Sequence, residues 1–147
     1  MLRDRIGEDL KDAMKARDQV RVATLRMLIA AVKNAQVEKM HELDDDEVIE
    51  VATREAKRRK ESIEAFRSGG RDDLVTKEEA ELAVLQQYLP EQLGDDELAA
   101  LVDDAIAETG ATGPKEMGAV MKALMPKVRG RADGAAVSAM VKQRLSG

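Results

Sequence analysis

The chain has no cysteine and no tryptophan, and its 147 residues include only one phenylalanine, one tyrosine and one histidine. The lack of cysteine excludes a disulfide framework, a thiolate zinc site and a cysteine nucleophile. Two aromatic rings are too few for an RNA-recognition sheet, in which bases stack on several exposed aromatic side chains. The single histidine, His41, has no second imidazole with which to share a metal ion, so we expect an exposed connector residue. We therefore predict no metal site and no cofactor.

Long apolar runs are also missing. The longest, Met27–Val32, has six residues, whereas a membrane-spanning helix needs about 20. The chain begins Met-Leu-Arg-Asp-Arg, and no hydrophobic segment of a signal peptide follows this charged start. We therefore expect a soluble, cytoplasmic protein that makes no contact with membranes.

The charged residues are unevenly distributed, although the net charge is only −5. Residues 91–110 contain seven acidic residues and no basic one, whereas residues 111–147 contain seven basic and two acidic residues. An acidic protein is a poor general binder of polyanions. The basic C-terminal end nevertheless indicates an anionic partner, with an ordinary solvated face as the alternative.

The composition predicts an all-α protein, because good helix formers predominate and runs of β-branched or aromatic residues are absent. Apolar residues recur every three or four positions between capping and breaking residues, which predicts seven helices. Their expected ranges are about 2–16, 20–39, 44–68, 76–89, 95–109, 114–125 and 134–145. The second of these segments is apolar nearly all round, so we expect it to be buried on several sides at the centre of the N-terminal bundle.

Pro90 marks the expected boundary between two helical subdomains. Thr76 and Glu79 have the spacing of a capping box that opens the fourth helix, and Pro90 closes this helix. A second proline, Pro126, is expected to end the sixth. We predict an N-terminal four-helix bundle over residues 1–90 and a C-terminal three-helix module over residues 91–147.

Several clusters that could carry chemistry are better explained as structural. The acidic run Asp44–Glu47 is followed by Val48 and Ile49, where a calcium loop needs an oxygen ligand and a glycine, so we interpret it as a helix N-terminus. The basic run Lys57–Lys60 spreads around its helix and has acidic residues four positions away, which predicts an exposed, self-neutralising helix. No serine follows a strand, and no phosphate-binding glycine pattern occurs. We expect no catalytic residue.

Lys127, Arg129 and Arg131 crowd a short connector, residues 127–131, that we call the basic turn. It precedes a helix for which Asp133 is the expected cap. Cations beside the backbone N–H groups of a helix start can hold phosphate groups. Against this, Asp133 already occupies the cap, and basic residues near the C-terminus also serve to complement the helix dipole.

Three C-terminal segments, Met117–Lys122, Gly130–Gly134 and Val137–Leu145, resemble the tail module of the GatB/YqeY family. This module closes the B subunit of the bacterial tRNA-dependent amidotransferase, which converts Glu-tRNA(Gln) to Gln-tRNA(Gln). The resemblance implies an all-helical protein of two subdomains and a bacterial origin. The N-terminal part is similar to stand-alone YqeY-like proteins at Leu25–Leu28, Lys33–Asn34, Arg58–Ser62, Gly70–Leu74 and Tyr88–Leu93, so the likeness covers essentially the whole chain.

The resemblance also implies where RNA would bind, because the tail of the B subunit helps to hold the tRNA while the chemistry lies elsewhere. The cations of this chain that match are Lys122, Arg131 and Lys142, and Lys127 and Arg129 are their neighbours. These five are the candidate RNA-binding residues. The catalytic cradle of the B subunit, with its metal and ATP ligands, has no counterpart in this sequence.

Three functions are compatible with these observations. The one that we favour is a non-catalytic accessory protein that binds tRNA, or a tRNA-handling enzyme, through the basic turn. The second is an adaptor that binds other proteins through the apolar N-terminal bundle or the acidic segment 91–110. The third, implied by family membership, is a carbon–nitrogen ligase with glutamine as amide donor, although the chain shows no nucleophile with a base beside it.

Overall fold

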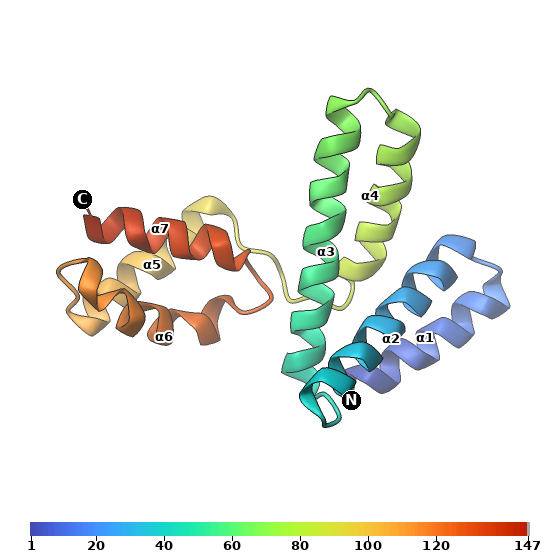
Figure 1. Cartoon of the computed structure of the whole chain (residues 1–147), viewed down its shortest axis with the longest axis horizontal. Helices are drawn as coiled ribbons and strands as arrows, with labels where there is room; N and C mark the ends of the chain where they lie inside the picture. Colours follow the sequence, from blue (N-terminus) through green and yellow to red (C-terminus); the bar gives the residue numbers. More distant parts are fainter. Residues whose placement is uncertain (147) are drawn as a thin grey trace. The chain divides into compact units, whose positions relative to one another are not determined.

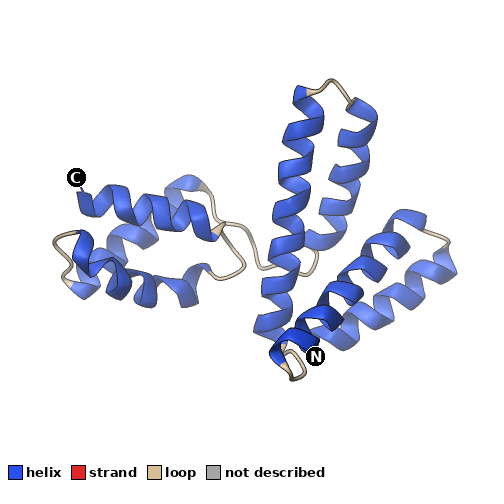
Figure 2. Cartoon of the chain, viewed as in Figure 1, coloured by secondary structure: helices blue, strands red, loops and turns tan. Residues whose placement is uncertain are grey.

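The computed structural model describes residues 1–146 (Figure 1). Figure 2 shows that the regular secondary structure in these residues is helical throughout, which confirms the all-α prediction. The helices are α1 (Leu2–Ala16), α2 (Gln19–Lys39), α3 (Asp45–Ser68), α4 (Asp72–Gln86), α5 (Asp95–Thr109), the 3-10 helix η1 (Pro114–Glu116), α6 (Met117–Val128) and α7 (Gly134–Ser146).

The helices divide between two compact units, residues 1–89 and residues 90–147. In the first unit, α1 and α2 form one antiparallel hairpin, and α3 and α4 form another (Figure 1). Side chains from all four helices build a common core, together with Leu43 from the α2–α3 loop and Tyr88 after α4. The core is aliphatic except for Tyr88 and the buried polar or charged residues Thr24, Glu55, Arg59 and Glu81.

Helix α2 contacts the three other helices of its unit, as its apolar composition suggests. Its burial is nevertheless one-sided. Leu25 and Leu28 are in the core, whereas Met27 is 39% and Val37 77% exposed. The expectation that this helix is buried on several sides is therefore wrong for its outer face.

The start of α3 follows the predicted capping pattern. Asp44 Oδ1 accepts a hydrogen bond from the Glu47 N–H at 2.8 Å, and Glu47 Oε1 accepts one from the Asp44 N–H at 3.1 Å. This reciprocal pair satisfies two of the donors that a helix start leaves unpaired. The acidic run is therefore a helix N-terminus, as the sequence indicated.

The start of α4 differs from the prediction. The helix begins at Asp72, four residues before Thr76, and the Thr76 hydroxyl donates back to the Asp72 carbonyl at 3.0 Å. Asp72 and Asp73 place negative charge at the positive end of the helix dipole, which favours the earlier start. Arg71 donates to both carboxylate oxygens of Asp73 at 3.2 Å. The hydrogen bond from Arg71 is the main reason that the pKa of Asp73 is lowered.

The expectation that Pro126 ends the sixth helix is also wrong, because α6 continues to Val128. Proline has no N–H to donate to the carbonyl four residues earlier, but the Arg129 N–H still donates to Met125 O at 2.9 Å. The helix ends at Val128, and the next residue, Arg129, has an extended ψ of 123°. Gly130 then adopts a φ of +73°, which suits glycine because it has no Cβ to clash.

The second unit packs α5, α6 and α7 around an aliphatic core. Helix α5 is capped by Gly94 rather than by Asp95 or Asp96, and Glu97 Oε1 accepts from the Gly94 N–H at 3.4 Å. No helix within residues 1–146 is both long enough and apolar enough to cross a bilayer. The buried core residues of this unit are Leu98, Val102, Ala105, Val120, Leu124, Val128, Val137, Val141 and Leu145.

Candidate nucleic-acid interface

The basic turn leads from the end of α6 to the start of α7, and local hydrogen bonds define its backbone. The Arg131 N–H donates to Val128 O at 2.8 Å, and the Ala132 N–H donates to the same carbonyl at 3.2 Å. Gly130 is buried between the two exposed or half-buried arginines that flank it. The turn therefore has one defined conformation rather than that of a loose loop.

The segment that begins the second unit is hydrogen-bonded to the basic turn. The Leu93 N–H donates to Arg131 O at 2.8 Å, and the Gln92 side-chain amide donates to Gly130 O at 2.8 Å. These bonds join residues that are 38 positions apart in the sequence. We call these two bonds, together with the two that the Arg131 guanidinium donates to Glu91 O and Lys127 O, the clasp.

The Arg131 side chain completes the clasp. Its Nε donates to Glu91 O at 3.0 Å, and its Nη1 donates to Lys127 O at 3.3 Å. Hydrogen bonds from a charged donor are stronger than those between neutral groups. Arg131 therefore positions the turn, and its predicted contact with RNA phosphate stays a prediction.

Lys127 and Arg129 have exposed side chains on the basic turn. Lys127 Nζ lies 3.6 Å from Glu108 Oε2 of α5. Exposed ion pairs of this kind contribute only about 0–1 kcal/mol, so a phosphate group can replace the carboxylate at little cost. The structure thus brings together three of the five candidate residues, Lys127, Arg129 and Arg131.

The other two candidates lie away from the basic turn. Lys122 is exposed on α6, about 7.5 Å along the helix axis and about 140° around it from Lys127. Lys142 is exposed on α7, about 12 Å along the axis from the first residue of that helix. A ligand that contacts all five cations must therefore extend over more than one helix.

The start of α7 is occupied by a side chain of the protein. Asp133 Oδ1 accepts a hydrogen bond from the Ala135 N–H at 3.3 Å, as the predicted cap should. This carboxylate takes a backbone donor that a phosphate at the helix start would need. The predicted anion site at the basic turn is therefore left with the side chains of the turn and not with the helix N-terminus.

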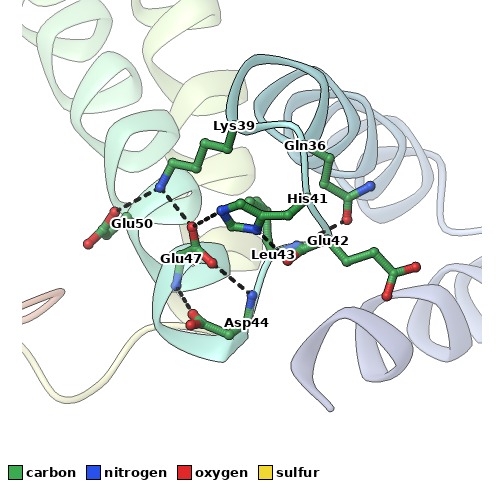
Figure 3. A network of polar contacts seen from close by, with 8 residues as sticks. All are labelled: Gln36, Lys39, His41, Glu42, Leu43, Asp44, Glu47 and Glu50. Carbon is green, nitrogen blue, oxygen red and sulfur yellow. Dashed lines mark hydrogen bonds and ion pairs between the residues drawn. The ribbon is translucent and has the colours of Figure 1, made fainter.

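A polar network in the first unit lies where α2 meets α3 (Figure 3). Lys39 Nζ donates to Glu47 Oε2 at 3.0 Å, and this hydrogen bond is the main reason that the pKa of Glu47 is lowered and that of Lys39 raised. His41 is 53% exposed, as expected of a connector residue, with Nε2 at 3.5 Å from the same carboxylate oxygen and Nδ1 at 2.8 Å from Glu42 O. Within residues 1–146, no group of three or more His, Cys, Asp or Glu side chains is placed to hold a metal ion. The network stabilises the junction.

A buried ionic group in the first unit was missed by the sequence analysis. Arg59 Nη1 donates to Glu55 Oε2 at 2.8 Å, and Arg59 Nε lies 3.7 Å from Glu81 Oε2 on α4. Because Arg59 is only 7% exposed, the prediction of an exposed basic helix is wrong for this residue. Its position four residues before the buried Ile63, on the apolar side of α3, was the available signal.

Comparisons with known proteins agree with the sequence motifs. The family model described as Yqey-like protein matches residues 3–145. A relative from Pyrenophora tritici-repentis, named Altered inheritance of mitochondria protein 41, mitochondrial, is 35% identical over 130 residues, which are 87% of this chain and 71% of the relative. A protein of the same name from Eremothecium gossypii is 35% identical over 110 residues, which are 73% of this chain and 60% of the relative.

A further relative, an uncharacterized protein of Schizosaccharomyces pombe, is 35% identical over 86 residues, 58% of this chain and 70% of that protein. This chain covers between 60% and 71% of the length of the three relatives. All three are fungal, and two are mitochondrial by name. The cytoplasmic location and bacterial origin expected for this chain stay predictions.

Proposed function

This chain belongs to the Yqey-like protein family, and on that premise we propose that it is a non-catalytic accessory protein of the cytoplasm that binds tRNA through its phosphates. The observation that carries the proposal is the basic turn, where exposed cations project from a backbone held by the clasp. A turn that is already ordered loses little conformational entropy when it binds a ligand. Two of its cations, Lys127 and Arg129, are the central contacts of this proposal.

Phosphate contacts, rather than base contacts, fit the composition of the second unit. The two aromatic residues of the chain, Phe66 and Tyr88, are in the first unit. Residues 90–147 therefore have no ring on which a base could stack. Cations without aromatic platforms bind RNA by charge and backbone shape, which positions a ligand without reading its sequence.

An accessory role leaves bond-forming chemistry to a tRNA-handling enzyme, which is the protein partner that the proposal allows. The alternative implied by the family resemblance is a carbon–nitrogen ligase with glutamine as amide donor. The cations of the basic turn can orient an RNA through its phosphates, which is a binding role. We therefore favour binding over catalysis as the function of this unit.

Salt-dependent binding of fluorescently labelled tRNA, measured by anisotropy, tests the proposal. Phosphate contacts from Lys122, Lys127, Arg129 and Lys142 predict a slope of about −3 for log K against log salt concentration, because each contact releases condensed counterions. The double variant Lys127→Glu/Arg129→Glu should weaken binding at least about tenfold and make the slope shallower by about 1.5, because it removes two of the four contacts.

A matched control separates a local contact from a general effect of net charge. Lys15 and Lys60 are exposed residues of the first unit, and Lys15→Glu/Lys60→Glu changes the net charge by the same amount as the double variant of the turn. This control should bind tRNA about as well as the unaltered chain. Equal losses in both double variants, or no binding by the unaltered chain at low salt, would contradict the proposal.

A further inference from the structure

The outer face of α2 is apolar although it is exposed. Residues at successive spacings of three and four occupy this face, all of them are exposed, and only one is polar. A surface helix normally presents charged and polar residues to water, whereas this spacing is typical of a helix that packs against another helix. We call this face the α2 stripe; its residues are Val20, Ala23, Met27, Ala30, Asn34 and Val37.

The α2 stripe borders an open groove between α2 and α3. The groove has a volume of about 350 Å³, and Ala30, Ala31 and Ala35 line it from α2. Small side chains allow the backbone of a bound helix to approach closely. Met27 and Arg58 line both this groove and a second hollow of about 360 Å³ that reaches α4. A shallow, partly apolar groove along a helix is the kind of surface that binds an amphipathic helix.

Basic side chains stand on both long borders of this surface. On α2, Arg26 and Lys33 flank the α2 stripe on the side away from the groove, at about 60–90° around the helix. On α3, Arg54 and Arg58 line the groove itself. All four are exposed, and Glu38 is the exposed acidic residue among those that line the groove. The borders therefore favour an occupant with negative charge on both flanks.

The second acidic residue of the groove is already neutralised. Glu55 is 7% exposed, and its two carboxylate oxygens accept from Arg59 at 2.8 Å and from Arg58 at 3.2 Å. These two hydrogen bonds offset the negative charge of Glu55, which therefore does little to repel an anionic partner. Because Arg58 shares its charge with Glu55, the positive charge on this border of the groove comes chiefly from Arg54.

We propose that the α2 stripe and the adjoining groove bind an acidic amphipathic helix of a partner protein. The apolar side of that helix covers Met27 and Ala30, and acidic residues on its flanks meet the basic borders. A second copy of this chain is a poorer occupant, because two antiparallel α2 helices would bring Arg26 of one against Lys33 of the other. Helix α5 is acidic too, but its own apolar residues are already buried in the core of the second unit.

Two pools of helical peptides test the proposal on the full chain. Both pools have the 21-residue length of α2 and carry variable aliphatic residues at three- and four-residue spacing, with Glu at every flanking position in one pool and Lys in the other. We expect the acidic pool to be retained about tenfold better, since the borders attract one sign of charge and repel the other. The best acidic peptide should shift the NMR signal of the Met27 methyl group.

Two substitutions locate the bound peptide. Ala30→Glu puts a negative charge in the middle of the α2 stripe and should weaken the acidic peptide at least about tenfold. Ala107→Glu is the matched control, because Ala107 is an exposed alanine of α5, and it should leave the affinity unchanged. Lys33→Glu/Arg54→Glu should weaken binding about fivefold and remove its salt dependence, whereas Lys15→Glu/Lys60→Glu should not.

Each alternative occupant gives a different result. Equal retention of both pools, an unperturbed Met27 methyl signal, or full affinity in the Ala30→Glu variant would overturn the proposal. So would a dimer of the chain that Ala30→Glu dissociates in sedimentation, or displacement of the peptide by tRNA. The proposed RNA contacts lie in the second unit, so the tRNA experiment and this one can fail independently.

Discussion

The two units of the chain differ in where their charged side chains lie. The first unit buries Glu55, Arg59 and Glu81 where α3 meets α4, whereas the buried core of the second unit is aliphatic. The second unit keeps its basic side chains at or near the surface and uses one of them, Arg131, to hold backbone carbonyls. Charge in the first unit joins α3 to α4 inside the core, whereas charge in the second lies at the surface, where pairs such as Lys127 with Glu108 are exposed to water.

The sharpest test of this comparison removes the buried cation of the first unit. Arg59→Ala leaves Glu55 and Glu81 buried without their shared partner, which should lower the free energy of unfolding by about 3–5 kcal/mol. Urea unfolding, followed by circular dichroism, measures the loss. The triple change Glu55→Leu/Arg59→Met/Glu81→Leu is the control, because apolar replacement of a whole buried ion group is often neutral or stabilising. A loss below about 1 kcal/mol in Arg59→Ala would mean that water already solvates the group.

A cavity in either core tests whether the units unfold separately. Leu124→Ala in the second unit and Leu28→Ala in the first should each cost about 2–5 kcal/mol, because both side chains are fully buried. Amide hydrogen exchange should show faster opening only in the unit that carries the substitution. Equal acceleration in both units would show that they unfold as one cooperative body and that the division at Pro90 is only geometric.

Local signals in the sequence were enough to predict most of the fold. Helix starts such as Asp44 were predictable because the residues that satisfy the cap are three positions apart. Several helix limits were not, among them the end of α4, which lies at Gln86 rather than at Leu89. Two of these limits depended on a competition that the motif alone does not decide. Asp72 and Asp73 favour an earlier start than the pattern at Thr76, and α6 tolerates Pro126 in its last turn.

Tertiary partners explain what the sequence could not predict about the polar sites. The spacing of Glu55 and Arg59 indicated an ion pair, but the burial of that pair depends on Glu81, which belongs to another helix. In the basic turn, Lys127, Arg129 and Arg131 lie together because they are near neighbours in sequence, and their contact with RNA stays a prediction. The clasp was not predictable, because Glu91 lies 40 residues from Arg131.

The clasp separates a positioning role from a binding role in the second unit. Arg131→Leu removes the guanidinium bonds to Glu91 O and Lys127 O, which should destabilise this unit by about 1–2 kcal/mol. Exchange of the Leu93 amide, which donates to Arg131 O, should accelerate correspondingly. Lys122→Ala is the control, since an exposed lysine on α6 should change stability by less than about 0.5 kcal/mol. Equal losses of stability in the two variants would mean that the clasp does not stabilise the second unit.

The smallest expected effect on the free energy of unfolding comes from Tyr88, which makes a partly buried polar contact in the first unit. The Tyr88 hydroxyl donates to Asp9 Oδ2 at 2.6 Å, and the Arg5 guanidinium lies 5.3 Å from the ring centroid. Burial, and then the hydrogen bond to Asp9, raise the pKa of Tyr88 above its ordinary value of 10.0. Since the folded chain holds this proton more tightly than the unfolded chain, the contribution is complete below pH 10 and is lost as the pH rises further.

At about pH 10.5 this loss should reach about 1 kcal/mol or less, and Tyr88→Phe should abolish this part of the pH dependence. The chain has no other tyrosine, so tyrosinate absorbance reports Tyr88 alone, and its midpoint in the folded protein should lie above that of the urea-unfolded chain. The second unit contains no tyrosine and should show no such step. Coincident midpoints in the folded and unfolded chain would mean that water, rather than Asp9, pairs with the hydroxyl of Tyr88.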